Sequence, residues 1–288
     1  MSDPSEPQDP REAPRLDPAL RRRSALRRFG RRPREFRRGI FLLPSLFTVA
    51  NMFCGYACVV HAMLGQLEMA APFIGFAIVL DMLDGRIARM TGTATAFGLE
   101  LDSLADVISF GLAPAVLAFA WGLSELGRVG WAAGFIYVSA AAMRLARFNI
   151  QSTAPSDKRY FVGMPSPPAA GVTAATVFAW PFPLTEPVEL RLIFSEPAVW
   201  QALAAVAVML VPAALMVSTI RFRSFKTINF GWGPSYMPLL LFTLLVALIF
   251  AAPQLTLLIL AYGYLMSAFI GMAWTRLRSR RQAPAAAE

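Results

Sequence analysis

Long apolar runs separated by short polar stretches are the dominant pattern of this chain of 288 residues. Several of these runs reach the roughly 17–25 residues that an α-helix needs to cross the hydrocarbon core of a bilayer. We predict eight membrane-spanning helices, at about residues 42–64, 69–90, 98–121, 129–149, 167–183, 198–219, 235–251 and 254–275. The predicted fold class is therefore an all-α polytopic membrane protein.

The composition supports this prediction, because 56% of the residues are hydrophobic and only 16% are charged. Soluble domains are usually about 45–50% apolar. We assign one membrane domain to residues 39–276 and a short tail to 277–288. Residues 1–38 are rich in Arg, Pro and acidic residues, and we expect a disordered basic tail that can form a helix on an anionic membrane surface. Nucleic-acid binding is disfavoured, because these arginines abut a membrane span.

The basic residues predict the orientation of the chain in the membrane. If the N-terminus is cytoplasmic, all but two of the 27 Lys and Arg residues lie in the tails or connections on the cytoplasmic side. Only Arg128 and Arg191 fall on the opposite side. Because positive charge is retained on the cytoplasmic face, this bias predicts that both termini are cytoplasmic.

Four aspartates interrupt the apolar pattern at the end of the second predicted span and the start of the third: Asp81, Asp84, Asp102 and Asp106. A charged residue near the centre of a membrane helix costs about 2.5–3.5 kcal/mol on insertion scales and usually marks function. The spacings i, i+3 and i, i+4 put each pair on one helix face. Two antiparallel helices joined by a short loop can direct all four carboxylates at one cavity.

Four unpaired carboxylates in one place would repel one another, so the pattern predicts bound cations. Oxygen ligation suits Mg²⁺, Mn²⁺ or Ca²⁺ better than zinc or copper. Two metals held by shared carboxylates are a standard arrangement for in-line displacement at phosphorus. The alternative is that the aspartates cap helix ends at the interface. Because the chain has one histidine, chemistry that needs a pair of histidines is excluded.

The spacing D-x₂-D-G-x₂-A-R-x₈-G-x₃-D-x₃-D over residues 81–106 resembles the signature of the CDP-alcohol phosphatidyltransferases at all eight fixed positions. RLARFN at 144–149, YFVGMPSPPAAG at 160–171 and the opening of the first span resemble the membrane-embedded (type II) phosphatidylserine synthases within that superfamily. One departure is Ser45, where that group has Asn after the proline.

The resemblance implies transfer of a phosphatidyl group from CDP-diacylglycerol to L-serine, with release of CMP. It implies that all four aspartates hold two divalent ions and that Asp106 is also the general base. Contacts to CDP-diacylglycerol are implied for five residues: Pro44, Ser45, Gly85, Arg89 and Thr95. Arg144 and Arg147 are expected to bind the serine carboxylate or a phosphate; membrane anchoring is the alternative. A homodimer in the cell (inner) membrane, with its active site at the cytoplasmic face, is also implied.

Three other functions remain open on the sequence alone. The same chemistry could use choline, glycerol 3-phosphate or an inositol phosphate, because the signature binds the shared CDP-lipid and not the acceptor. Intramembrane carboxylates also occur in cation or proton transporters, although here they cluster instead of tracing a path across the bilayer. A non-catalytic lipid-binding scaffold would have no need of four carboxylates.

Overall fold

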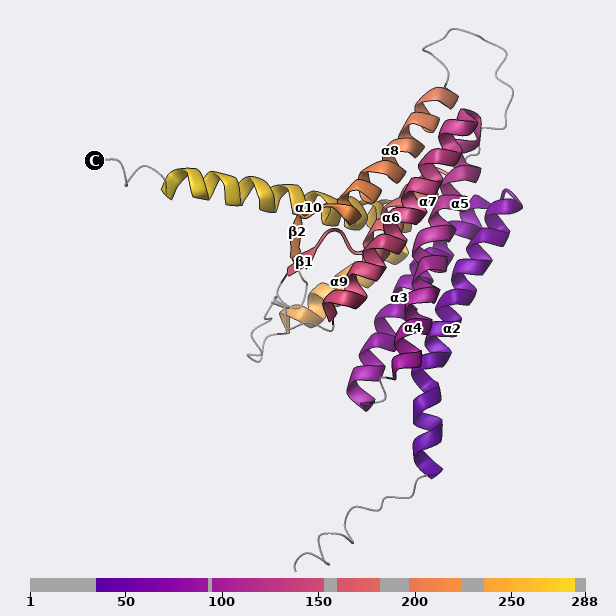
Figure 1. Ribbon diagram of the computed structural model, residues 1–288. Coiled ribbons are helices and arrows are strands. Elements are labelled where there is room, and N and C mark those ends of the chain that lie inside the picture. The colour runs from indigo at the N-terminus through magenta and orange to yellow at the C-terminus, as the bar shows by residue number, and fades with distance from the viewer. Residues whose placement is uncertain (1–34, 93–94, 153–159, 182–196, 224–235, 283–288) are drawn as a thin grey trace, which may run out of the picture. The chain divides into compact units, whose positions relative to one another are not determined.

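Apolar helices form nearly all of the described structure, which is a computed structural model (Figure 1). It describes residues 35–92, 95–152, 160–181, 197–223 and 236–282. Of the arginine-rich tail predicted for residues 1–38, positions 1–34 lie outside the described residues. Positions 283–288 of the predicted C-terminal tail also lie outside them. The account below concerns the compact unit that begins at Leu43.

The helices follow the predicted spans closely. In chain order the elements are α2 (Glu35–Met63), α3 (Leu67–Thr91), α4 (Ala96–Asp106), the π-helix η1 (Val107–Leu112), α5 (Ala113–Trp121), the 3₁₀-helix η2 (Leu123–Leu126), α6 (Arg128–Ser152), β1 (Tyr160–Val162), α7 (Ser166–Ala179), α8 (Pro197–Val217), β2 (Arg221–Arg223), α9 (Met237–Ala251) and α10 (Pro253–Gln282). Each predicted span coincides with one helix, or with one run of consecutive helices. Most ends agree to within a few residues, but α2 begins seven residues before its predicted span and α10 ends seven residues after its own.

Three helical segments of the described chain are long and apolar enough to cross a membrane: Pro44–Met63, Ala96–Trp121 and Arg128–Ile150. Two shorter apolar helices cover Ala202–Val217 and Leu239–Ala251. The predicted helical class, with helices able to span a membrane, is thus confirmed. The number of spans and the side on which the termini lie stay predictions.

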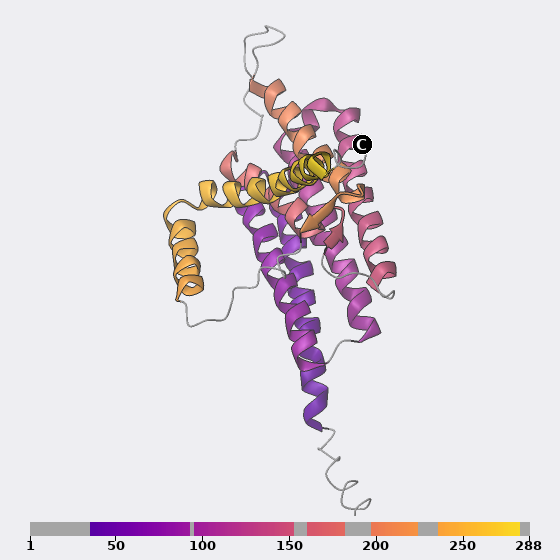
Figure 2. The ribbon, with the colours of Figure 1, turned by 90° about the vertical axis from the view of Figure 1, so that its left-hand side faces the viewer.

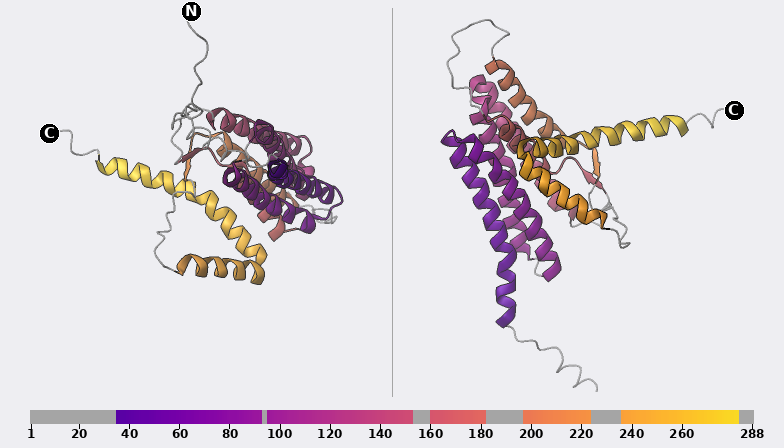
Figure 3. Two further views of the ribbon diagram at one scale, coloured as in Figure 1. Left: turned by 90° about the horizontal axis from the view of Figure 1, so that it is seen from below. Right: turned by 180° about the vertical axis from the view of Figure 1, so that it is seen from behind.

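The core lies where α3, α5, α6, α7 and α8 pack against one another. Small residues dominate this core, and Ala70, Ala77, Ala113 and Ala169 are almost fully buried. Small side chains let membrane helices approach closely, because the apolar lipid provides little hydrophobic drive for helix association. Helices α2 and α3 and the run from α4 to α5 lie side by side (Figures 1 and 3).

Two features were not predicted from the sequence. First, β1 and β2 form an antiparallel pair with Phe161 opposite Phe222. This pair joins the segment before α7 to the segment after α8, and Gly163 follows it with a φ of 84°. A side chain at Gly163 would collide with the carbonyl oxygen of Met216. Second, the π-helix η1 interrupts the run from α4 to α5. The break predicted between residues 251 and 254 is confirmed, because α9 turns sharply into α10 around Ala252 (Figure 2).

Candidate active site

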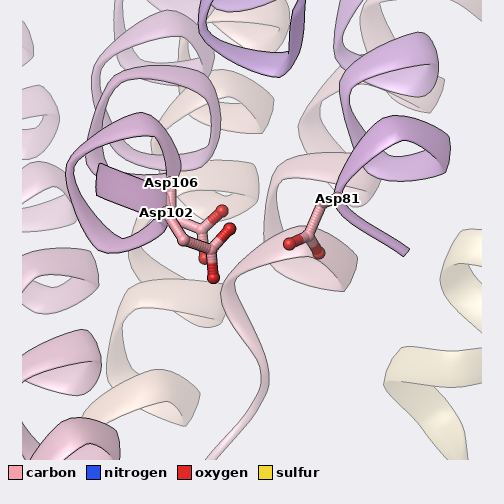
Figure 4. Close-up of side chains that lie close together, drawn as sticks. All are labelled: Asp81, Asp102 and Asp106. Carbon is pink, nitrogen blue, oxygen red and sulfur yellow. The ribbon is translucent and has the colours of Figure 1, made fainter. Parts of the chain in front are cut away.

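Three carboxylates from two helices meet at one point. Asp81 lies on α3, and Asp102 and Asp106 lie one turn apart on α4. One ligand oxygen from each of the three lies within 4.8 Å of the others. Figure 4 shows the side chains of Asp102 and Asp106 directed toward that of Asp81. The helical spacing read from the sequence does bring these three residues together.

Asp84, the fourth predicted ligand, lies outside this group of three. It is 4% exposed, and its Oδ2 accepts a hydrogen bond of 3.1 Å from the hydroxyl of Thr48 on α2. The same hydroxyl also approaches the carbonyl oxygen of Pro44 at 3.1 Å. A carboxylate that ligates a metal is commonly oriented by such a neighbouring donor.

The three-carboxylate group fits a divalent cation. Oδ1 of Asp102 and Oδ1 of Asp106 are buried and have no hydrogen-bond partner among the described residues. A buried carboxylate oxygen without a partner costs free energy, and a cation supplies the missing interaction. Because all the donors are carboxylate oxygens, the site suits a hard cation. Asp81, Asp102 and Asp106 are the residues placed to hold it.

The remaining residues of the signature lie around this group. Gly85 follows Asp84 on α3, and a Cβ added there would lie 3.9 Å from Nη2 of Arg89, an ordinary contact distance. Arg89 is exposed near the end of α3. Thr95 is the N-cap of α4, and its hydroxyl accepts a 3.0 Å hydrogen bond from the amide of Gly98. This cap gives Thr95 a structural role whatever it contacts besides.

The opening of the first span provides two further predicted contacts. Pro44 lies within α2 and is half-buried. Ser45, the residue that departs from the group's usual asparagine, follows it and is also half-buried. Both lie one turn before Thr48, which bonds Asp84, so this end of α2 belongs to the neighbourhood of the aspartates.

The two arginines of the RLARFN block have different surroundings. Arg144 is half-buried on α6, and its Nη1 donates a 2.7 Å hydrogen bond to the hydroxyl of Ser166 at the start of α7. Its guanidinium also attracts the carboxylates of Asp81 and Asp106. Arg147 instead donates a 3.3 Å bond to the carbonyl oxygen of Val217 at the end of α8. Arg144 therefore faces the site, whereas Arg147 ties α6 to α8.

An apolar cavity of about 580 Å³ lies on the side of α3 that faces α7 and α10. Residues of α3, α7, α9 and α10 line it, including Val79, Ala174 and Leu257. Tyr264 of α10 also lines the cavity, and it interacts electrostatically with Arg144. Tyr264 thus marks the junction between an apolar space and the polar site. The volume is within the range of small-molecule pockets.

Comparison with known proteins agrees with this geometry. The model of the CDP-alcohol phosphatidyltransferase family matches residues 41–218, which include every aspartate of the site. The chain belongs to this family. Enzymes of the CDP-alcohol phosphatidyltransferase family are transferases, so membership favours an enzyme over the transporter and the scaffold considered above.

Curated relatives carry more specific names. The chain is 36% identical over 214 residues to a CDP-diacylglycerol–serine O-phosphatidyltransferase of Helicobacter pylori, covering 74% of this chain and 84% of that protein. It is 42% identical over 144 residues to a protein of the same name from Mycobacterium leprae, covering 48% of each. An archaetidylserine synthase of Methanothermobacter thermautotrophicus is 32% identical over 182 residues, covering 62% of this chain and 69% of that protein.

Several residues of the site were missed from the sequence. Thr48 is a polar residue within the first apolar run, and its position could have marked the face of that helix that contacts Asp84. Ser166 sits in the block 160–171 that the resemblance singled out, without a role assigned to it. Tyr264 gave no signal, because an aromatic residue in an apolar helix is ordinary.

Proposed function

We propose that this protein is a CDP-diacylglycerol–serine O-phosphatidyltransferase, a metal-dependent phosphatidylserine synthase. The observation that carries the proposal is the meeting of Asp81, Asp102 and Asp106 from two helices within the matched family region. The names of the relatives from Helicobacter pylori and Mycobacterium leprae support serine as the acceptor.

The aspartates hold two divalent ions, Mg²⁺ or Mn²⁺, with Ca²⁺ as a further candidate. Asp81, Asp84, Asp102 and Asp106 are the proposed ligands, and Thr48 orients Asp84. When bound, such a pair of ions neutralises the charge on a pyrophosphate and makes its phosphorus more susceptible to attack.

The lipid donor lies along α2, α3 and α7. Its nucleotide end contacts Pro44, Ser45, Gly85, Arg89 and Thr95, and the exposed guanidinium of Arg89 is free to follow the phosphates. Its diacylglycerol end occupies the apolar cavity lined by Val79 and Ala174, because acyl chains prefer an apolar lining to water. The position of Tyr264 between cavity and polar site supports one continuous substrate path.

The acceptor lies beside Arg144. A guanidinium can bind a carboxylate through two parallel hydrogen bonds, and Ser166 holds one Nη of Arg144 in place. Arg147 contributes charge at the same helix end. Serine bound in this way presents its hydroxyl toward the aspartates that attract Arg144.

Transfer is a single displacement. Asp106 accepts the proton of the serine hydroxyl, and the serine oxygen forms a bond to the phosphorus that bears diacylglycerol. The bond from that phosphorus to the CMP oxygen breaks, and CMP leaves. Arg89 balances the negative charge that develops on the phosphate oxygens. No carboxylate has to act as a nucleophile.

The membrane arrangement follows from the same proposal. Eight spans with both termini cytoplasmic place the aspartates at the cytoplasmic face of the cell (inner) membrane, where soluble serine is available. Thr95 caps α4 at that end. The chain acts as a homodimer, as the resemblance implies.

An acceptor panel tests this function. Purified protein with CDP-diacylglycerol and Mn²⁺ is supplied separately with L-serine, choline, glycerol 3-phosphate and an inositol phosphate, and release of CMP is measured. We expect CMP release to depend on L-serine and the lipid product to contain it. Release driven by another alcohol would reassign the acceptor and keep the chemistry. Ion flux in proteoliposomes without any CMP release would refute the transferase.

A further inference from the structure

Asn51 of α2 is a fully buried polar side chain whose hydrogen bonds are unaccounted for. It is 0% exposed. Neither its Oδ1 nor its Nδ2 has a hydrogen-bond partner among the described residues. A buried polar group left unpaired costs about 1–3 kcal/mol, and in a native protein it calls for an explanation. An apolar residue would be the cheaper choice at such a position unless the amide has a function.

Two hydrogen bonds place the segment of α2 around Asn51 between α3 and η1. Thr48, one turn earlier on α2, donates to Asp84 of α3. The carbonyl oxygen of Asn51 itself accepts a 2.9 Å bond from the hydroxyl of Ser109, which lies on η1 directly after α4. The helix that carries Asn51 is thus hydrogen-bonded to α3 on one side and to η1 on the other.

The depth of Asn51 follows from helix geometry. An α-helix rises about 1.5 Å per residue, so three residues move about 4.5 Å along the axis. Helices α2 and α3 run antiparallel. The step from Thr48 forward to Asn51 on α2 therefore has the same direction in space as the step from Asp84 back to Asp81 on α3. Asn51 therefore lies level with Asp81.

The contact between α2 and η1 places Asp106 at the same depth along the helix axes as Asn51. A Cβ added at Gly55 would lie 2.8 Å from the Cα of Ser109, so the two backbones touch there. Asp106 precedes Ser109 by three residues on a run parallel to α2, which places it near the level of Asn51. Oδ1 of Asp106 is itself buried and has no partner among the described residues.

We propose that Asn51 is a positioning residue of the aspartate cluster, whose carboxamide donates a hydrogen bond to Asp106 when a divalent cation is bound. Asp106 uses one oxygen for the cation in that state, and Asn51 holds the carboxylate in the orientation that ligation and proton transfer require. Outer partners of this kind typically change metal affinity by about 10–100-fold. The inference rests on the proposed function in one respect, which is that the aspartates bind a divalent cation.

Asn51→Leu separates this role from a purely structural one. Leucine has the same number of side-chain heavy atoms and the same branching at Cγ, and it removes the unpaired amide, so thermal stability in detergent without added metal should stay the same or rise. We expect Mn²⁺ affinity, measured by electron paramagnetic resonance of free Mn²⁺, to fall about 10–100-fold, and kcat to fall with it. The matched control is Tyr137→Phe on α6, which removes a buried hydroxyl that, like the Asn51 amide, lacks a partner among the described residues. It should leave Mn²⁺ affinity unchanged.

Each outcome has one meaning. Unchanged Mn²⁺ affinity and kcat in a stable Asn51→Leu protein would overturn the inference and leave the proposed function standing. Absence of Mn²⁺ binding by the unaltered protein would overturn both. If Asn51→Leu fails to fold, the smaller Asn51→Ser takes its place, and it must show the same loss of affinity. In an Asp106→Asn background the Leu substitution should cause little further loss, because the bond has lost its charged acceptor.

Discussion

The hydroxyl of Thr48 on α2 donates a 3.1 Å hydrogen bond to Oδ2 of Asp84 on α3, and both side chains are buried. This bond ties the first long helix to the helix that carries two of the four aspartates. In the proposed enzyme it orients a metal ligand.

Thr48→Val removes the hydroxyl and preserves the shape of the side chain. We expect Mn²⁺ affinity and kcat to fall about 10–100-fold, because Asp84 loses the donor that orients it. Titration of activity with Mn²⁺, together with direct binding, measures the effect. Thr243→Val on α9 is the control, since Thr243 also donates to the carbonyl four residues earlier and lies away from the site. Equal losses in both variants would show that the effect is not specific to Asp84.

Asp106→Asn tests the proposed general base. The amide cannot accept the serine proton, so kcat should fall about 10²–10⁴-fold. Binding of CDP-diacylglycerol, measured by calorimetry, should remain detectable because Asp81, Asp84 and Asp102 are intact. A variant that turns over at the normal rate would remove Asp106 from this role.

Arg144→Ala tests the acceptor site. Losing a charged hydrogen-bonding partner should raise the KM for L-serine about 10- to 100-fold and change the KM for CDP-diacylglycerol much less. Ser166→Ala, which removes the partner of Arg144, should have a smaller effect of the same kind. Arg128→Ala is the control, because Arg128 is exposed at the opposite end of α6. A larger effect on the lipid KM would assign Arg144 to the donor.

Val79→Trp tests the assignment of the apolar cavity to the acyl chains. Val79 lines the cavity and is 54% exposed, so the larger ring can fill the space without disturbing the core. The KM for long-chain CDP-diacylglycerol should rise about 4–15-fold, as expected for the loss of one or two buried methylene contacts, while the KM for serine stays unchanged. Val129→Trp on α6, at a similarly exposed position outside the cavity, should leave both constants unchanged. Identical lipid kinetics in the two variants would place the acyl chains elsewhere.

The sequence predicted the helices and the aspartate group for the same physical reason. A helix that crosses a bilayer needs an uninterrupted apolar run, and a carboxylate inside such a run stands out. The spacing of Asp102 and Asp106 then fixes their shared face without knowledge of the tertiary structure.

The contacts between distant segments could not be predicted in this way. The bond from Thr48 to Asp84 depends on how α2 is rotated about its axis, and the apolar run around Thr48 does not specify that rotation. Strands as short as β1 and β2 have no independent signal, because each exists only through its partner about sixty residues away. The π-helix after Asp106 likewise depends on close packing, in which Gly55 meets Ser109 on one side and Gly111 meets Ala141 on the other.

Direct measurement of Mn²⁺ binding to the purified protein and to Asp102→Asn tests the central claim, that carboxylates from α3 and α4 share divalent cations. We predict that the unaltered protein binds two ions per chain and that Asp102→Asn loses at least one of them, with affinity for the other weakened. Asp102→Asn that binds Mn²⁺ with unaltered stoichiometry and affinity would contradict the claim.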